Sequence, residues 1–205
     1  METRKLSPAV TELFGFFFAD SQSVNSDPKT HIIVDDGRRY LLRSNKVFDI
    51  ITLDPPPPIE AATSSLLYSR EFYDIAKTHL APGGILQQWF PGGDDMILYA
   101  VARSLQESFP HVIAFKSIGD SGYHFLASIS PMPDISPAEF VMRLPESSKR
   151  DLMEWNGDIT IQKMAANILS QRTDIEKLLP SHGANMIVTD DRPYNEYFYL
   201  RRNGL

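Results

Sequence analysis

The sequence contains no cysteine among its 205 residues. Disulfide bonds, thiolate metal sites and cysteine nucleophiles are therefore excluded. Long apolar runs are also missing, since no stretch approaches the roughly 20 apolar residues of a transmembrane helix. The most apolar run, residues 13–19, ends at Asp20, and the first residues lack the long apolar core of a signal peptide. We therefore expect a cytoplasmic protein with no membrane span.

Positive charge is in short supply, because 20 Lys and Arg stand against 26 Asp and Glu, a net charge of −6. This balance argues against binding duplex DNA through counterion release, and we expect no nucleic-acid partner. The five histidines show no metal-ligand spacing, so we predict no metal site. A serine hydrolase is disfavoured because no Gly-x-Ser-x-Gly motif is present.

What the chain does have is enough apolar material for a folded core, at 42% hydrophobic and 22% charged residues. Two short apolar runs read as strands that deliver carboxylates into turns. His31–Val34 ends at Asp35, Asp36 and Gly37, and Phe48–Leu53 ends at Asp54 and four prolines. Neither run alternates cleanly, which is typical of a parallel sheet covered on both faces.

Helical periodicity separates these strands from later ones. It predicts a helix from Ser7 to about Asp20 and a loop over 21–29. Residues 16–18 (Phe-Phe-Phe) are expected to pack into the core rather than anchor a membrane, and the alternative is that they mark an interface where a missing strand exposes them. Further helices are expected at about 64–80 and 95–109, with strands at 85–90, 112–115 and 124–129, the last two as a pair. This alternation predicts an α/β fold built from βαβ units.

The last third has a different character. Residues 136–179 give helical signals only, and 186–188 read as a short strand that runs into a polar, aromatic-rich segment. We expect an α/β domain over 1–132, with a helical appendage and C-terminal tail over 133–205 packed on it.

Candidate functional residues lie where strands end, because ligands of open α/β sheets bind at the carboxyl ends of the strands. The acidic ends are Asp35-Asp36-Gly37, Asp54, and the Gln87-Gln88 end with Asp94-Asp95 beyond it. Such carboxylates can accept from a ribose hydroxyl, an exocyclic amine or a substrate ammonium. The alternative for each is a helix N-cap or a turn-forming aspartate.

These segments, together with residues 67–73 (Leu-Tyr-Ser-Arg-Glu-Phe-Tyr), 80–87 (Leu-Ala-Pro-Gly-Gly-Ile-Leu-Gln) and 189–197 (Thr-Asp-Asp-Arg-Pro-Tyr-Asn-Glu-Tyr), resemble the spermidine synthase (polyamine aminopropyltransferase) family. The resemblance implies a Rossmann-like, methyltransferase-type sheet, mostly parallel with one antiparallel pair near its end. It also implies transfer of an aminopropyl group from decarboxylated S-adenosylmethionine, as co-substrate, to a polyamine amine. No metal is implied.

The resemblance also assigns roles to individual residues. Asp54 matches the carboxylate that accepts the proton of the attacking amine, because a protonated amine cannot attack a sulfonium carbon. Asp36 and Gly37, with Asp35 beside them, match the turn that holds the adenine. Gln87 or Gln88 and Tyr68 are expected near the mouth of the substrate pocket.

The chain departs from the family pattern at three places. Pro57 stands where the family has a second aspartate that anchors the amine, and Glu60 is the nearest replacement carboxylate. Lys5 replaces the acidic residue that binds the ribose. The family's glycine-rich first strand would precede Met1, so we expect a chain that lacks the N-terminal domain and this strand and forms a partial Rossmann-like domain, truncated at its N-terminus. A sheet without that strand leaves unpaired backbone groups, so we expect a homo-oligomer or a partner that completes the sheet.

Two alternatives stay open. The chain could be a catalytically inactive remnant or interaction module of the same fold, which the departures at Lys5 and Pro57 favour. It could also be an S-adenosylmethionine-dependent methyltransferase, since Asp54-Pro55-Pro56 resembles the Asp-Pro-Pro-Tyr motif of amino-methyltransferases. Pro57 occupies the position of the aromatic residue that stacks on the base in those enzymes.

Overall fold

The structure is a computed structural model, and it describes residues 2–5, 8–55, 59–61, 64–119, 121–154, 156–179, 186–196, 200, 203 and 204. At 2–5, 10 and 11 it describes the backbone alone. The chain forms two compact units, Met1–Lys46 and Val47–Leu205. The expected division at residue 132 falls inside the second unit and stays a prediction.

The first unit contains a small parallel sheet and short helices: β1 (Glu2–Lys5), α1 (Pro8–Glu12), α2 (Phe14–Phe17), α3 (Ser21–Ser26), β2 (His31–Val34) and α4 (Gly37–Arg43). Glu2 pairs with His31 and Lys5 with Val34, so the predicted strand at 31–34 is confirmed. The single helix expected from Ser7 to Asp20 is wrong. A turn at Leu13 separates α1 from α2, and the extended backbone at Phe18 ends α2.

Two further expectations for this unit are corrected. Residues 21–26 form a helix, α3, where a loop was expected. The helix was missed because its sequence is polar and has no apolar periodicity from which it could be predicted. The side chains of Phe16, Phe17 and Phe18 are 81%, 69% and 55% exposed and so are not core residues. Their ring contacts are local, with Phe16 stacked edge-on against Phe17 and Phe18 tilted against Phe14.

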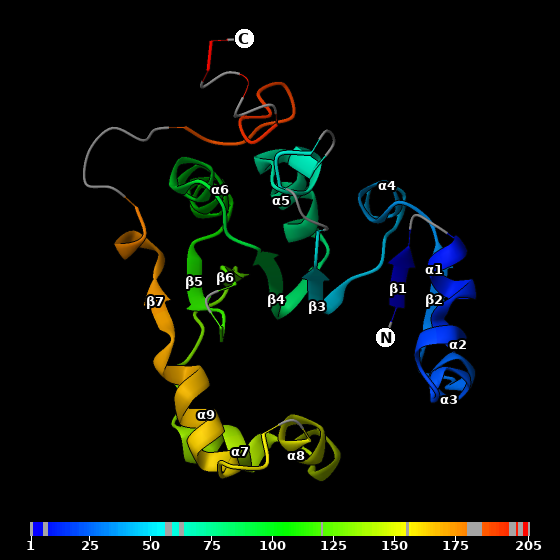
Figure 1. Cartoon of the computed structure of the whole chain (residues 1–205). Coiled ribbons are helices and arrows are strands. Elements are labelled where there is room, and N and C mark those ends of the chain that lie inside the picture. The colour runs from blue at the N-terminus through cyan, green and yellow to red at the C-terminus, as the bar shows by residue number, and fades with distance from the viewer. Residues whose placement is uncertain are drawn as a thin grey trace. The chain divides into compact units, whose positions relative to one another are not determined.

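The second unit is built on a five-stranded sheet in the order β3-β4-β6-β5-β7 (Figure 1). Its elements are β3 (Phe48–Leu53), a 3₁₀ turn (Ser64–Leu67), α5 (Arg70–Thr78), β4 (Leu80–Phe90), α6 (Asp95–Ser108), β5 (His111–Lys116), β6 (Tyr123–Ser128), α7 (Pro137–Arg143), α8 (Glu146–Met153), α9 (Ile161–Ser170), β7 (Arg172–Asp174) and a second 3₁₀ turn (Ile175–Lys177). The β3-α5-β4 unit is parallel, whereas β4–β6, β5–β6 and β5–β7 are antiparallel. The predicted βαβ unit and the predicted strand pair are both confirmed.

Capping residues set the helix boundaries of this unit. The helix expected over 64–80 is instead a 3₁₀ turn followed by α5, because the Ser69 hydroxyl caps α5 by accepting from the Phe72 backbone N–H. Asp94 caps α6 in the same way, by accepting from Met96 N at 2.8 Å. The strand expected at 85–90 begins earlier, at Leu80, since Leu80 already pairs with Phe48.

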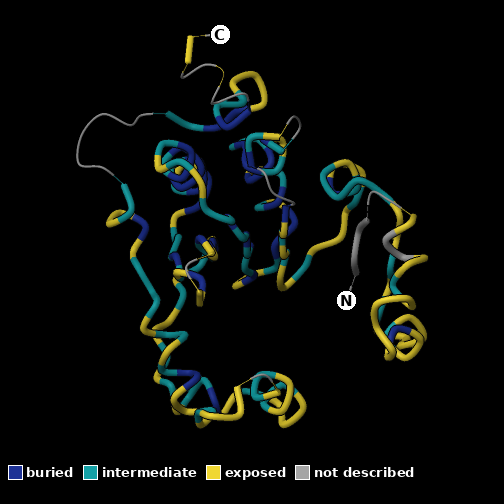
Figure 2. The backbone as a smooth tube through the Cα atoms, in the orientation of Figure 1, coloured by how far each residue is buried: buried dark blue, intermediate teal, exposed yellow. Residues whose placement is uncertain are grey.

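One face of the five-stranded sheet carries the core. Helices α5 and α6 lie side by side and bury this face, and burial concentrates there (Figures 1 and 2). The fully buried side chains come from both layers: Phe72, Tyr73, Ala76, Ile97, Val101 and Leu105 on the helices, and Leu86, Gln88, Phe90, Phe125 and Ala127 on the strands. Alternate residues of the strands point to the opposite face, where Thr52 and His124 are exposed and Gln87 is half-buried.

The C-terminal third differs from expectation in two places. Residues 172–174, read as helical from the sequence, form β7, in which Asp174 pairs with Ile113 at the edge of the sheet. Residues 186–188, read as a strand, form none, and Val188 instead bonds to α5 and α6. Within the described ranges, no helix has the length and apolar character required to span a bilayer.

Candidate functional site

Asp54 lies at the carboxyl end of β3, on the exposed side of the sheet. Leu53 pairs with Gln88 and Thr52 with Gln87, so the two-residue period of the strand places Asp54 on the face shared by Thr52 and Gln87. Its side chain is exposed, while the following Pro55 is buried and ends the strand. An exposed carboxylate at a strand end is available to a ligand approaching this edge of the sheet.

Tyr68 is the buried neighbour of this carboxylate. Its side chain is fully buried, and its hydroxyl has no hydrogen-bond partner among the described residues. Burial raises the pKa of Tyr68 well above its usual range, and the negative charges of Asp54 and Glu60 raise it further. The phenol therefore stays protonated and lies in the field of both carboxylates, with an unused hydrogen-bond donor.

Glu60 reaches this region from the loop that follows β3. Its side chain is half-buried, and a Cβ built on Gly93 would lie 3.7 Å from Glu60 Oε1. Gly93 has a φ of 135°, which residues with a side chain rarely adopt. Because glycine has no side chain, the backbone of the loop after β4 passes close to Glu60. The charges of Asp54 and Glu60 thus both act on Tyr68. Pro57, the third residue expected in this region, lies outside the described residues.

The two glutamines of β4 point to opposite faces and have different surroundings. Gln88 is fully buried, accepts from the Tyr73 hydroxyl at 2.5 Å and donates to the Leu67 carbonyl at 2.9 Å. Burial, with a smaller effect of Tyr68, raises the pKa of Tyr73 well above its usual range. Gln88 thus holds α5 and the preceding turn against the sheet, and of the two glutamines Gln87 lies on the face of Asp54.

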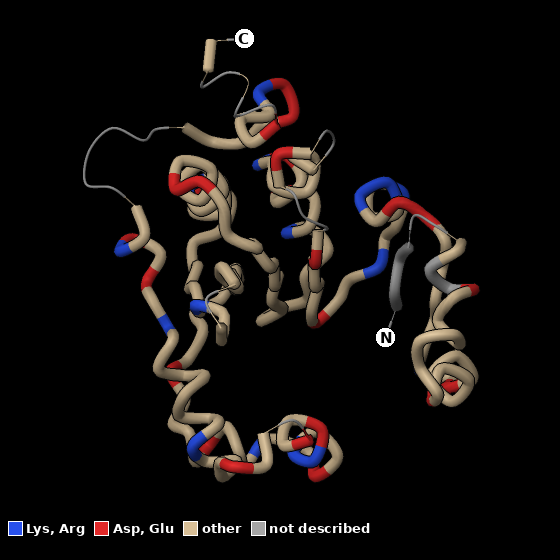
Figure 3. The backbone as a smooth tube through the Cα atoms, in the orientation of Figure 1, with Lys and Arg blue, Asp and Glu red and all other residues tan. Residues whose placement is uncertain are grey.

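His124 is a candidate site residue to which the sequence analysis assigned no role. It lies on β6 opposite Trp89, and its Nδ1 is 3.2 Å from Gln87 Nε2. With the Gln87 amide as donor, the imidazole carries its proton on Nε2. Burial lowers the pKa of His124, and the negative charge of Asp54 opposes this effect in part. Strands β4 and β6 carry no Lys, Arg, Asp or Glu (Figure 3).

The residues expected at the adenine belong to the first unit and are engaged locally. Asp36 Oδ1 accepts from Arg39 N at 2.6 Å and so caps α4, which begins at Gly37. Asp35 accepts from Asp36 N at 3.0 Å and pairs with Arg43 at 2.7 Å. The N-cap alternative is therefore confirmed for Asp36. A Cβ at Gly37 would meet nothing within 4 Å, so this helix start is open on that side.

Metal ligands do not converge anywhere in the described parts of the chain. No group of three or more His, Asp or Glu side chains there could hold an ion. The groups around the Asp54 carboxylate are a second carboxylate (Glu60), a phenol (Tyr68) and a neutral imidazole (His124). Such a set suits a cationic, hydrogen-bonding ligand from which a proton is withdrawn.

Comparison with known proteins adds a family relationship to this geometry. The model of the family described as "Spermine/spermidine synthase domain" matches residues 6–112, just over half of the chain. The polyamine aminopropyltransferase of Mycobacterium tuberculosis is 26% identical over 188 residues, which cover 85% of this chain and 36% of that protein. The chain spans less than half of such relatives: the match covers 28% of polyamine aminopropyltransferase 2 of Pseudomonas aeruginosa and 48% of the polyamine aminopropyltransferase of Pyrobaculum islandicum.

Solved structures show the same fold. A spermidine synthase in complex with the transition-state analogue AdoDATO has a TM-score of 0.55 at 16% identity, over 73% of this chain and 60% of that one. Human methyltransferase-like protein 13, in complex with SAH, has a TM-score of 0.55 at 13% identity, over 93% of this chain and 76% of that one. The fold is therefore Rossmann-like, of the methyltransferase type.

Proposed function

Because the chain belongs to the spermine/spermidine synthase family, we propose that it is an aminopropyltransferase that acts on a polyamine amine. The donor would be decarboxylated S-adenosylmethionine, and Asp54 would take the proton of the attacking amine. The observation that carries the proposal is that the charges of Asp54 and Glu60 both act on the buried hydroxyl of Tyr68, which has no hydrogen-bond partner among the described residues. An ammonium ion suits this set because it donates to carboxylates and to a phenol oxygen, and the neutral amine left after proton loss can accept from the phenol O–H.

The proposed reaction is a single displacement. The amine nitrogen attacks the methylene carbon beside the sulfonium, a C–N bond forms, and the C–S bond breaks with its electron pair on sulfur. The thioether product is methylthioadenosine, and the proton lost by nitrogen passes to Asp54. Glu60 and Tyr68 would hold the amine in line, and this orientation would supply much of the rate enhancement.

Other roles in this proposal rest on the family resemblance of the sequence. Asp35, Asp36 and Gly37 would contact the adenine from the turn before α4. The local hydrogen bonds of the two carboxylates each leave acceptor capacity, because a carboxylate has about four lone-pair sites. Gln87 would face the substrate and would also keep His124 neutral through their 3.2 Å contact.

Ligand-induced stabilisation tests the proposal directly. We expect methylthioadenosine and decarboxylated S-adenosylmethionine to raise the melting temperature, because a ligand at about 100 times its Kd stabilises a folded binder by roughly 2.7 kcal/mol. Aminopropyl transfer to putrescine should then be detectable by product analysis. A shift with S-adenosylmethionine alone would favour the methyltransferase alternative, and a cooperative melt unmoved by any of the three would favour an inactive remnant.

The protonation state of His124 predicts how activity depends on pH. Burial lowers the pKa of His124, so the imidazole is neutral at pH 7 and becomes cationic only as the pH falls through that lowered value. The imidazolium would then compete with the substrate ammonium for Asp54. We expect kcat/KM for the amine to fall about tenfold per pH unit below that pKa. Steady-state rates of wild type and His124→Gln, measured across this range, check the expectation.

The matched control for this profile is His111→Gln, at the start of β5, which should reproduce the wild-type curve. The glutamine at position 124 should flatten the acid limb, because no imidazolium can form there. An acid limb that survives in His124→Gln would assign it to another group and contradict the prediction.

A further inference from the structure

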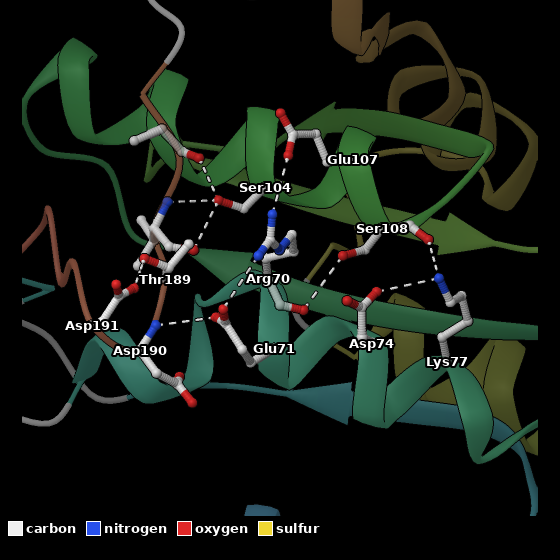
Figure 4. A network of polar contacts seen from close by, with 12 residues as sticks. Arg70, Glu71, Asp74, Lys77, Ser104, Glu107, Ser108, Thr189, Asp190 and Asp191 are labelled. Atoms are coloured by element: carbon white, nitrogen blue, oxygen red, sulfur yellow. Dashed lines mark hydrogen bonds and ion pairs between the residues drawn. The ribbon is translucent and has the colours of Figure 1, made fainter.

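The C-terminal segment over residues 188–196, here called the clasp, is held at one end by the two core helices (Figure 4). The Val188 carbonyl accepts from Arg70 N at 2.9 Å, and Val188 N donates to Ser104 Oγ at 2.8 Å. Asp190 N donates to Glu71 Oε2 at 3.0 Å. The Arg70 bond satisfies a backbone N–H in the first turn of α5, which has no partner within the helix.

Charged and hydroxyl side chains brace this end of the clasp. Arg70 pairs with Glu71 at 3.5 Å and with Glu107 of α6 at 3.9 Å (Figure 4). Ser108 Oγ donates to the Arg70 carbonyl at 3.4 Å. The clasp therefore begins on a surface where α5 and α6 are already tied together.

The other end of the clasp reaches the loop that carries Glu60. Its described residues are 59–61, together with Ser64 and Ser65 at the start of the 3₁₀ turn Ser64–Leu67. Asn195 Nδ2 donates to the Ile59 carbonyl at 2.5 Å and to Ser64 Oγ at 3.1 Å. Glu196 Oε1 accepts from Ser65 Oγ at 2.5 Å. The side chains of Ile59, Ser65, Asn195 and Glu196 are all at most 9% exposed.

Burial makes these bonds costly to lose. A buried carbonyl or hydroxyl left without its partner cannot turn to water, so the backbone must move to recover the hydrogen bond. Ile59 is the residue immediately before Glu60, and the Tyr68 N–H bonds to the Ser65 carbonyl at 2.9 Å. The clasp thus holds the chain at Ile59, before Glu60, and at Ser64 and Ser65, after it. These contacts determine where the Glu60 carboxylate lies.

We infer that the clasp positions the amine site, with Asn195 and Glu196 as positioning residues that keep the Glu60 carboxylate where its charge acts on Tyr68 together with that of Asp54. This inference rests on the proposed function. It assigns a role to a segment outside residues 6–112, the range matched by the family model. The clasp residues act through the loop and leave the nucleoside end of the donor untouched.

A series of variants tests the inference. Asn195→Ala and Glu196→Ala should each raise the KM for putrescine at least about tenfold, because displacing a binding group by an ångström is enough for such an effect. The affinity for methylthioadenosine should stay within about twofold of wild type. Glu196→Gln keeps an acceptor oxygen for Ser65 and should restore the wild-type KM, which a loss of general stability would not predict.

Hydrogen–deuterium exchange of the ligand-free protein provides a readout that does not depend on activity. Peptides covering residues 59–69 should exchange at least about tenfold faster in both alanine variants and at the wild-type rate in Glu196→Gln. Arg192→Ala is the control from the same segment, since its side chain is exposed. Ser65→Ala removes the same bond from the loop side and should match Glu196→Ala, with no added effect in the double variant.

The outcomes separate the two proposals. If wild type shows no aminopropyl transfer, the proposed function fails, and the exchange rates still decide whether the clasp holds the loop. Unchanged exchange at residues 59–69 in Asn195→Ala and Ser65→Ala would overturn the clasp. If Asn195→Ala and Glu196→Ala weaken the binding of putrescine and of methylthioadenosine to the same extent, the clasp contributes only general stability, and the positioning role is overturned.

Discussion

Asp54→Asn is expected to lower kcat for aminopropyl transfer by about 10²- to 10⁴-fold, the range that general acid–base catalysis contributes. The amide has nearly the shape of the carboxylate but cannot accept the amine proton, and it removes one of the two charges acting on Tyr68. Stabilisation by methylthioadenosine should be unchanged, because this thioether lacks the aliphatic amine that Asp54 would contact. Single-turnover rates with saturating donor measure the chemical step directly.

Asp49→Asn is the matched control for this substitution. Asp49 is an exposed carboxylate on the same strand, five residues before Asp54, and its removal changes the net charge by the same amount. It should leave kcat within about twofold of wild type, as surface changes away from a site usually do. Full transfer by Asp54→Asn would remove Asp54 as the base. An absence of transfer in wild type would instead favour the inactive alternative.

The parts of the fold that were predicted correctly carry strong local signals. The strands at 31–34 and 48–53 are short apolar runs closed by acidic turns, and α6 has both a capping aspartate and regular apolar spacing. The antiparallel pair β5 and β6 is joined by a glycine-containing turn. In each case one short segment contains the information that determines the structure.

The errors arise where a single hydrogen bond or a distant partner decides. Apolar spacing continues across Ser69, but its hydroxyl caps a new helix and interrupts the predicted one. Residues 172–174 contain no apolar residue, and β7 exists because β5 offers a free edge. The cap at Ser69 is a local signal that apolar spacing alone does not report. The strand β7 depends on tertiary context, which overrides local propensity.

The candidate site shows the same division. Asp54 could be found because it ends a strand, whereas the choice between Gln87 and Gln88 depends on register, and a shift of one residue exchanges the two faces of a strand. His124 acquires its surroundings from Gln87, 37 residues away, and the bonds of Glu196 to Ser65 and of Asn195 to Ile59 join residues more than 130 apart. The sequence carries no local signal for contacts of this kind.

The turn between β5 and β6 approaches the end of β4 closely at Gly122. Gly122 is buried with a φ of 90°, and a Cβ there would lie 1.9 Å from the Phe90 carbonyl oxygen and 2.5 Å from Gly92 N. These are backbone atoms at the end of β4 and cannot rotate aside. Trp89 Nε1 donates to the neighbouring Ser121 carbonyl at 3.1 Å, so the same approach fixes the pairing of β4 with β6 that places His124 near Gln87.

Gly122→Ala is therefore expected to destabilise the second unit by more than about 4 kcal/mol, a value reached only by severe mechanisms such as this overlap. Gly119→Ala is the control, because Gly119 shares a positive φ of 86° in the same turn but a Cβ there meets nothing within 4 Å. Backbone strain alone should cost it about 1 to 3 kcal/mol. Urea unfolding followed by tryptophan fluorescence measures both. Equal losses in the two variants would show that strain, rather than the close approach of β4 and the turn, determines this position.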